Sequence, residues 1–141
     1  MAIPSRGAPR SVYEAKTRDV LVRVTPIYVP EQSDPDRARF TWTYTVEIEN
    51  HGPETLQLVS RHWIITDGLN RTEEVKGPGV VGEQPTLKPR EAFRYTSGCP
   101  LTTPSGAMRG AYQMMTEGGE TFDAAIPEFS LHMPDATRRM N

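Results

Sequence analysis

Hydrophobic and polar residues alternate strictly through one long segment in the first half of the chain. Phe40, Trp42, Tyr44, Val46 and Ile48 are separated by threonine and glutamate residues. Successive side chains of a β-strand point to opposite faces, so this period of two predicts a strand with one buried and one exposed face.

Similar patterns, together with the turns between them, predict the remaining strands. These strands are expected at Val20–Val29, Thr55–Thr66, Arg71–Lys76, Glu91–Ser97, Met108–Glu117 and Thr121–Leu131. The second half of Thr55–Thr66 is apolar on both faces, as in a central strand. Asp67–Asn70 and Glu117–Glu120 predict tight hairpin connections. About seven strands without a helical segment predict an all-β fold, an antiparallel sandwich or barrel.

Two details refine this prediction. Pro26 interrupts the first strand, which indicates that this strand lies at a sheet edge or contains a bulge. The spacing around Tyr112 is that of a tyrosine corner in immunoglobulin-like sandwiches, with Met114 in the place of a core cysteine and Trp63 as the core tryptophan. The alternative interpretation is an ordinary strand in which Met, Gly and Tyr alternate.

The ends of the chain differ from its body. The first 18 residues contain prolines, a glycine and no periodicity, and four of their five charged residues are basic. The predicted organisation is therefore a flexible basic tail at 1–18, one sandwich domain at 19–131 and a C-terminal tail at 132–141.

Composition and charge exclude several classes of protein. The chain has 141 residues, enough for one domain with its own core, and a net charge of −2, which argues against binding to nucleic acid. Cys99 is the single cysteine, so an internal disulfide and a cysteine-rich zinc site are excluded. Short apolar runs and a polar N-terminus predict no membrane insertion, no secretory signal and a cytoplasmic protein.

One glycine-rich segment matches a known phosphate-binding pattern. Gly77, Gly79 and Gly82 have the spacing G-x-G-x-x-G, which in dinucleotide-binding folds opens a helix. Here Pro85 and Pro89 follow, so no helix can form and that fold is excluded. Successive glycine amides could still form an anion-binding nest. The favoured interpretation is that the glycines supply the backbone angles of a loop.

The remaining candidates for chemistry are isolated side chains. His62 lies within a predicted strand, where a structural role is more common than an acid–base role. The three histidines are scattered and have no metal-ligand spacing. Ser97 has no nucleophile-elbow motif, and Cys99 precedes a proline with no base near it in sequence.

Several blocks of sequence, in order along Asp19–Leu131, closely resemble the ApaG family, also called CorD. The blocks are Leu58–Gly68 (LVSRHWIITDG), Gly77–Pro85 (GPGVVGEQP), Tyr95–Gly98 (YTSG), Thr103–Pro104 (TP), Met108–Tyr112 (MRGAY) and Ile126–Leu131 (IPEFSL). This resemblance implies a fibronectin type III-like β-sandwich. It implies no enzymatic activity, because none is established for the family.

The resemblance also implies a biological context. The second family name links it to cobalt resistance and magnesium efflux. Similar domains in eukaryotic F-box and polymerase-associated proteins look like protein-interaction modules. The family's glycine motif, here at Gly77, Gly79 and Gly82, has invited a pyrophosphate-binding suggestion.

The sequence therefore predicts a non-enzymatic binding module that presents loops and sheet edges to a protein partner, with no catalytic, metal or cofactor residues. The expected surface consists of Arg61, Asp67, Arg71, Lys76, Gly77, Gly79, Gly82, Glu83 and Gln84. The first alternative is a small ligand at the glycine loop, namely phosphate, pyrophosphate or a divalent ion. The second is an enzyme that uses His62 as a base.

Overall fold

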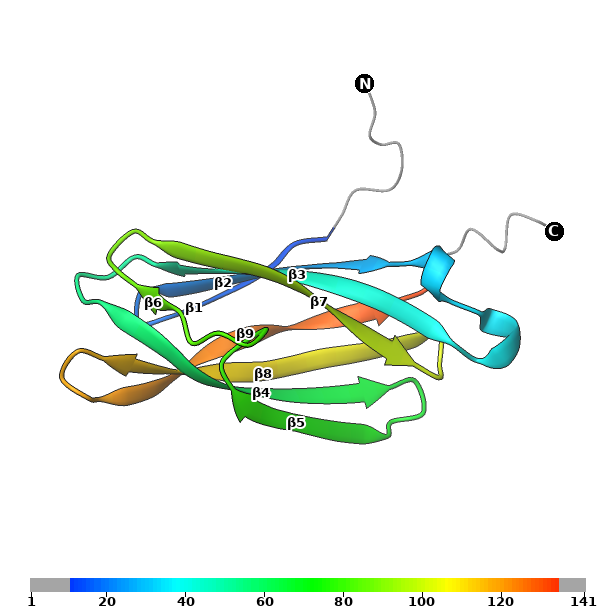
Figure 1. The fold of residues 1–141 in the computed structure, drawn as a ribbon. Helices are drawn as coiled ribbons and strands as arrows, with labels where there is room; N and C mark the ends of the chain where they lie inside the picture. Colours follow the sequence, from blue (N-terminus) through cyan, green and yellow to red (C-terminus); the bar gives the residue numbers. More distant parts are fainter. Residues whose placement is uncertain (1–10, 135–141) are drawn as a thin grey trace, which may run out of the picture.

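A computed structural model describes residues 11–134 of the chain, and these residues form two antiparallel β-sheets packed face to face (Figure 1). One sheet has the strand order β1-β2-β3-β7, and the other has the order β5-β4-β8-β9, with β6 pairing to β4. The strands are β1 (Tyr13–Thr17), β2 (Val20–Tyr28), β3 (Phe40–Asn50), β4 (Leu56–Asp67), β5 (Thr72–Pro78), β6 (Thr86–Leu87), β7 (Ala92–Leu101), β8 (Ser105–Thr116) and β9 (Thr121–His132). The predicted antiparallel sandwich is confirmed, with nine strands among the described residues where about seven were expected.

The alternating segment forms β3, in the middle of its sheet. Every second residue of β3 is buried, from Phe40 to Asn50, so the period of two reports the core face correctly. Strand β3 pairs with β2 on one side and with β7 on the other. Between β2 and β3 the chain makes two short 3-10 turns, η2 (Pro30–Gln32) and η3 (Pro35–Arg37).

Both predicted hairpins are present. Strand β4 turns into β5 through Asp67–Arg71, where the Asp67 amide donates to the Arg71 carbonyl at 2.9 Å. Strand β8 turns into β9, where the Thr116 amide donates to the Glu120 carbonyl at 2.8 Å. Strand β4 is central, as predicted, because it pairs with β8 on one side and with β5 and β6 on the other.

Pro26 lies where β2 has a free edge. Strand β1 pairs with β2 only as far as Val24, so among the described strands Pro26 faces β3 on one side and none on the other. Proline lacks the amide hydrogen of a sheet ladder, which makes this position tolerable. Of the two predicted explanations, the edge is the one found.

The prediction of an N-terminal tail over residues 1–18 is wrong for the residues that form β1. Tyr13–Thr17 forms β1, an edge strand of the first sheet. At the other end β9 extends to His132, and the Met133 amide donates to the Pro104 carbonyl at 2.9 Å. The rest of the two predicted tails, residues 1–10 and 135–141, lies outside the described residues.

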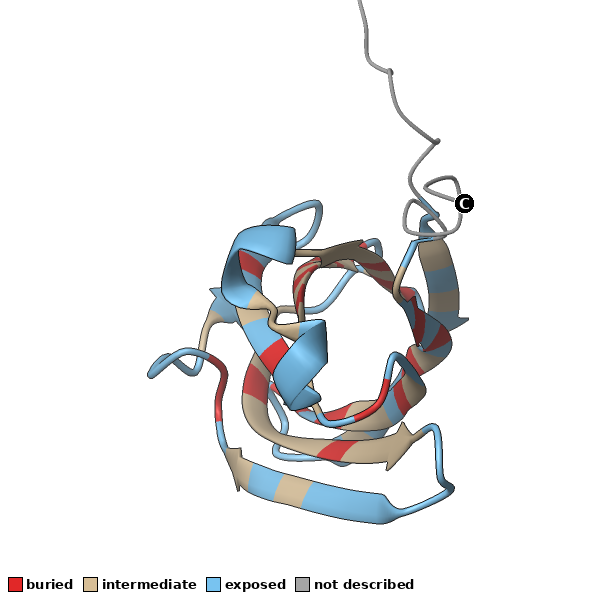
Figure 2. Cartoon of the chain, turned by 90° about the vertical axis from the view of Figure 1, so that its right-hand side faces the viewer, coloured by how far each residue is buried: buried red, intermediate tan, exposed pale blue. Residues whose placement is uncertain are grey.

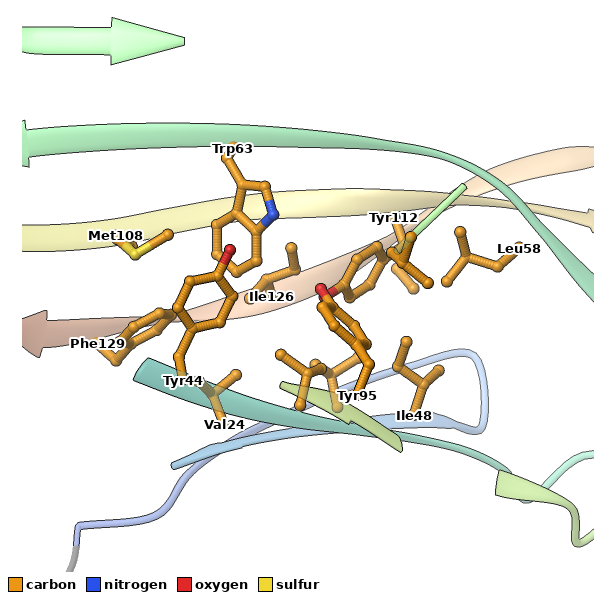
Figure 3. Packing of buried hydrophobic residues seen from close by; sticks show 14 of the residues in the cluster. Val24, Tyr44, Ile48, Leu58, Trp63, Tyr95, Met108, Tyr112, Ile126 and Phe129 are labelled. Atoms are coloured by element: carbon orange, nitrogen blue, oxygen red, sulfur yellow. The ribbon is translucent and has the colours of Figure 1, made fainter. Parts of the chain in front are cut away.

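The core between the sheets is rich in aromatic residues (Figure 3). Trp63 is buried and packs edge-on against Tyr44 and Tyr112, with ring centroids 5.2 and 6.3 Å apart, as expected of a core tryptophan. The Tyr112 hydroxyl, however, shares a hydrogen bond of 2.5 Å with the hydroxyl of Tyr95 in the opposite sheet. A tyrosine corner bonds to the backbone instead, so the ordinary-strand interpretation of Met108–Met114 is the one supported.

The two sides of the sandwich differ. On one side β9 packs against β1 and β2, and the Ala125 amide donates to the Thr17 hydroxyl at 3.1 Å. On the other side β5 and β7 are the terminal strands of their sheets. The end-on view in Figure 2 shows β5 at the lower margin of the molecule, with mostly exposed residues. This second side carries the predicted glycine loop.

Candidate functional site

Residues 78–84 form a small hairpin between β5 and β6, here called the glycine loop. The amides of Val80 and Glu83 donate to each other's carbonyls, both at 2.8 Å. Between them Val81 and Gly82 both have positive φ, 42° and 81°. A two-residue turn with positive φ at both positions matches the right-handed twist of a hairpin. The predicted helix-free loop is thus an ordered turn.

Strand β4 fixes this loop to the sandwich through one side chain and one backbone carbonyl. Arg61 Nη1 donates to the carbonyls of Pro78 and Gly79, at 3.0 and 2.9 Å. Strand β4 bulges between Leu58 and Ser60. The Val59 carbonyl within this bulge accepts from the Gly79 amide at 2.9 Å and from Gln84 Nε2 at 2.8 Å.

The conformation of the loop depends on the side chain of Val80 and on the absence of a side chain at Gly79. Val80 is fully buried in the core, so its side chain anchors the turn by hydrophobic burial. Gly79 has φ of 59°, and a Cβ atom there would lie 2.0 Å from the Glu83 carbonyl oxygen. Only glycine fits this close approach of two backbones.

The loop's hydrogen bonds weigh against an anion nest. The amides of Gly79, Val80 and Glu83 already donate to carbonyls, which leaves the amides of Val81, Gly82 and Gln84. These three amides are not a continuous run, because the Glu83 amide between them is already bonded. They form a poorer phosphate site than a run of convergent amides. The guanidinium of Arg61, one of the predicted cations, also binds two carbonyls.

Asp67 and Arg71 lie at the opposite end of the β4–β5 hairpin from the glycine loop. Arg61 and Asp67 are six positions apart along β4, or about 20 Å in an extended strand. Arg71 Nε donates to Asp67 Oδ2 at 2.7 Å, and the amides of Leu69 and Arg71 donate to Oδ1. The predicted surface is therefore two separate sites, because the hairpin register places Gly77, and not Arg71, beside Arg61.

The electrostatics of Asp67 follow from this arrangement. Partial desolvation acts to raise the pKa of its carboxyl group, but the two amides and the Arg71 guanidinium outweigh it and lower the pKa. Arg71 also donates to the Thr102 hydroxyl at 3.1 Å. Asp67 and Arg71 thus form a structural cap on the hairpin.

Lys76 and His62 lie opposite each other on the outer face of the second sheet. His62 Nε2 lies 2.8 Å from Glu74 Oε1, and this hydrogen bond lowers the pKa of the Glu74 carboxyl group. Both side chains are exposed to a large degree, and a catalytic base works in a pocket that excludes water. The geometry gives His62 the role of a surface partner of Glu74.

The side chain of Cys99 points into the sandwich and not into a reactive environment. Burial, with a smaller effect from the charge of Glu73, raises the pKa of its thiol to about 11. A nucleophilic cysteine needs a lowered pKa. Residues 11–134 also contain no group of three or more His, Cys, Asp or Glu residues that could hold a metal ion.

Two features of this side of the molecule were not predicted from the sequence. Val81 is 54% exposed although it is hydrophobic and β-branched. A groove of about 350 Å³ opens between β5 and β7, with Tyr44 and Trp63 in its wall and Glu73 at its rim. Glu73 and Val75 share one face of β5, and a charged residue beside a hydrophobic one on that face was a usable signal for a partly open surface. The groove itself could not be predicted, because its other side is β7, which comes much later in the chain.

The fold and the site together define an antiparallel β-sandwich of the fibronectin type III and immunoglobulin kind, with a rigid loop on one side. The family model described as the ApaG domain matches residues 30–116. The chain belongs to the ApaG family.

Individual relatives support this assignment. Protein ApaG of Caulobacter vibrioides is 63% identical over 96% of this chain and 97% of its own length. Protein ApaG of Methylocella silvestris is 59% identical over 92% of this chain and all of its own length. A crystal structure from Bordetella pertussis, described as an ApaA protein, is 56% identical, has a TM-score of 0.81 and covers 85% of this chain and 98% of that one.

A helix that crosses a bilayer needs a long and continuous apolar stretch. Within residues 11–134, no helix has the length and apolar character needed for such a crossing.

Proposed function

We propose that this chain is a non-enzymatic module that binds a protein partner in the cytoplasm through its glycine loop. The observation that carries the proposal is Val81. This residue is 54% exposed, hydrophobic and β-branched, and it has a φ of 42° at the tip of the loop. A β-branched residue in this region is strained, and strain of this kind concentrates at functional sites.

The rigidity of the loop favours binding. Arg61, Gln84 and buried Val80 fix the loop before any partner arrives. A preorganised surface loses less conformational entropy on association, so more of the contact energy appears as affinity. Val81 would then be inserted into a partner without a further ordering step.

A single substitution separates binding from stability. Val81→Gly removes the exposed side chain and relieves the positive φ, so the variant is expected to be as stable as the parent or more stable. Capture of partners from a cell lysate by the immobilised protein should fall about tenfold, as measured by mass spectrometry. The matched control is Leu69→Ala, because Leu69 is the exposed hydrophobic residue at the other hairpin tip (67% exposed). Equal capture by Val81→Gly and the parent protein would exclude the glycine loop as the surface.

Small-ligand binding is the alternative, and the turn amides of Val81 and Gly82 are the donors that it would use. An amide NMR titration with magnesium, cobalt, pyrophosphate and ATP, each added separately, distinguishes the two functions. We expect no saturable shift in the loop at millimolar ligand. Saturable shifts centred on Gly77–Gln84 would favour a phosphate or divalent-ion site over the protein partner.

We further propose that the partner acts in divalent-cation homeostasis, the context implied by the family's second name. Cells that carry only the Val81→Gly variant should then be as sensitive to cobalt as cells without the protein. Growth curves in graded cobalt measure this. Parental resistance in the variant strain would separate the glycine loop from cation homeostasis.

A further inference from the structure

The groove between β5 and β7 opens into the interior of the sandwich. Its wall includes Tyr44, Trp63 and Met108, all buried, and its rim includes Val75 and Glu73 on β5. The Tyr44 and Trp63 rings, which meet across the two layers with centroids 5.2 Å apart, are visible in Figure 3. A hydrophobic side chain that enters from the open side would therefore contact aromatic rings directly.

The backbone of β5 provides a place to hold such a side chain. Strand β5 pairs with β4 alone among the described strands, so its other edge is unpaired. Hydrogen-bonded and non-hydrogen-bonded pairs alternate in an antiparallel ladder. Because the Asp67 amide donates to the Arg71 carbonyl, the same alternation directs the amides and carbonyls of Glu74 and Lys76 toward the free edge.

Glu73 gives one end of this edge a charge preference. At the other end Arg61, which also lines the groove, lies beside Gly77 and binds the loop carbonyls. Glu73 is exposed, lies on the groove side of β5 two residues from Val75, and takes part in no hydrogen bond or ion pair among residues 11–134. Its neighbour Glu74 points to the opposite face, where it contacts His62. An inward-pointing charge on an edge strand prevents indiscriminate pairing, and the same charge selects a guest of opposite charge.

We propose that β5 binds an extended segment of a partner protein as an added strand, and that the segment carries a hydrophobic residue and a lysine or arginine two positions apart. The hydrophobic side chain lies opposite Val75 and enters the groove, and the basic side chain pairs with Glu73. Directly opposed residues of neighbouring strands are the pairs that interact most strongly. This inference rests on the proposed function, since it names a second contact of the same partner beside the glycine loop.

A second copy of this chain is a poor occupant of the same edge. The groove face of β5 consists of Glu73, Val75 and Gly77, without a basic residue. Antiparallel pairing of two β5 strands centred on Glu74 would oppose the two Glu74 carboxylates, whereas pairing centred on Val75 would place Glu74 opposite Lys76 and Glu73 opposite Gly77. Like charges opposed across strands are destabilising, and no register places a basic residue of the second copy's β5 opposite Glu73. The observations therefore favour a different chain that carries a basic residue at this position.

The test uses short capped peptides and the full chain. The probe peptide is a run of threonines around a central Leu-Thr-Arg, and the controls carry Leu-Thr-Glu or a proline in place of the middle threonine. Amide NMR should show saturable shifts over Thr72–Lys76 and slowed hydrogen exchange at Glu74 and Lys76 with the probe alone. Equal binding of all three peptides, or binding of none, would overturn the proposal.

Variants at one position test the charge pairing. Glu73→Gln should weaken binding of the Leu-Thr-Arg peptide about threefold, the size expected of an exposed ion pair. Glu73→Lys should prefer the Leu-Thr-Glu peptide. Glu74→Gln is the matched control, because this side chain points away from the groove, and it should bind the probe like the parent. An effect at Glu74 equal to that at Glu73 would contradict the proposed orientation.

The lysate experiment with Val81→Gly separates this inference from the proposed function. If partners are captured through Val81 while no peptide binds to β5, the added strand is wrong and the binding module stands. If Val81→Gly captures partners like the parent and no peptide binds, both are wrong.

Discussion

Gly79 shows how one residue position controls the candidate site. Its φ is 59°, and a methyl carbon at this position would lie 2.0 Å from the Glu83 carbonyl oxygen, which excludes every side chain. Gly82 also has a positive φ, 81°, but no atom lies within 4 Å of the position of its Cβ. Gly79 is therefore required by a close contact as well as by its backbone angle, and Gly82 by its backbone angle alone.

Substitution by alanine should distinguish these reasons. Gly79→Ala is expected to lower the free energy of unfolding by about 3 kcal/mol, from strain and contact together. Gly82→Ala should lower it by about 1 kcal/mol, from the backbone angle. Urea unfolding of both variants measures the difference. Equal losses would mean that the loop can move away from the close contact.

At the scale of elements, the β4–β5 hairpin depends on the Asp67 carboxylate. Its pKa is lowered in the folded protein, so the unfolded chain binds the proton more readily. The stabilisation is therefore present above the unfolded pKa and is lost as the pH falls through the folded pKa. This dependence belongs to the acid side, below about pH 5.

Asp67→Asn tests the cap directly. The variant should be less stable than the parent at neutral pH, and the difference should shrink on acidification. Urea unfolding of both proteins between about pH 7 and pH 2 measures the two curves. A difference independent of pH would show that the loss comes from geometry and not from the charge of Asp67.

The burial pattern of each strand explains which strands could be predicted from the sequence. Strand β3 was predicted because five buried residues alternate with polar ones, and half-burial is a property of the strand itself. Tyr13–Thr17 was assigned to a tail because the first 18 residues contain prolines and a glycine and show no hydrophobic periodicity, and the structure leaves the residues of β1 only partly buried or exposed. An edge strand of this kind is stabilised by its partner, here β2, more than by its own pattern.

At the scale of the whole molecule, a buried hydrogen bond joins the two sheets. The hydroxyls of Tyr95 on β7 and Tyr112 on β8 lie 2.5 Å apart in the core. Burial is the main cause that raises the pKa of both phenols, so both stay neutral at physiological pH. A buried hydroxyl without its partner destabilises a protein more than the loss of the bond alone.

A double-mutant cycle measures this link. Tyr95→Phe and Tyr112→Phe should each lower the free energy of unfolding by about 2 kcal/mol, because each leaves one buried hydroxyl unpaired. The double variant should lose clearly less than the sum, since neither hydroxyl is then left. Additive losses in urea unfolding would show that water replaces the missing partner.

The candidate site was predicted only in part. Gly77, Gly79 and Gly82 were predicted to supply the backbone angles of a loop. Gly79 and Gly82 have positive φ values, whereas Gly77 lies within β5 and does not. Asp67 and Arg71 were grouped with them because they are close in sequence. The register of β4 and β5 separates them in space, and no local pattern reports the distance between the two ends of a hairpin.

The sequence by itself determined the fold class, the inward face of the main strands and the positions of the hairpins. These properties follow from short-range alternation and turn chemistry, which act within a few residues. The tertiary structure alone decided that β5 and β7 are the terminal strands of their sheets within residues 11–134 and lie beside a common groove. It also decided that Arg61 binds the loop carbonyls and that Val81 is exposed at the tip of the glycine loop. These properties depend on which distant strands become neighbours, and that choice is made by packing of the whole core.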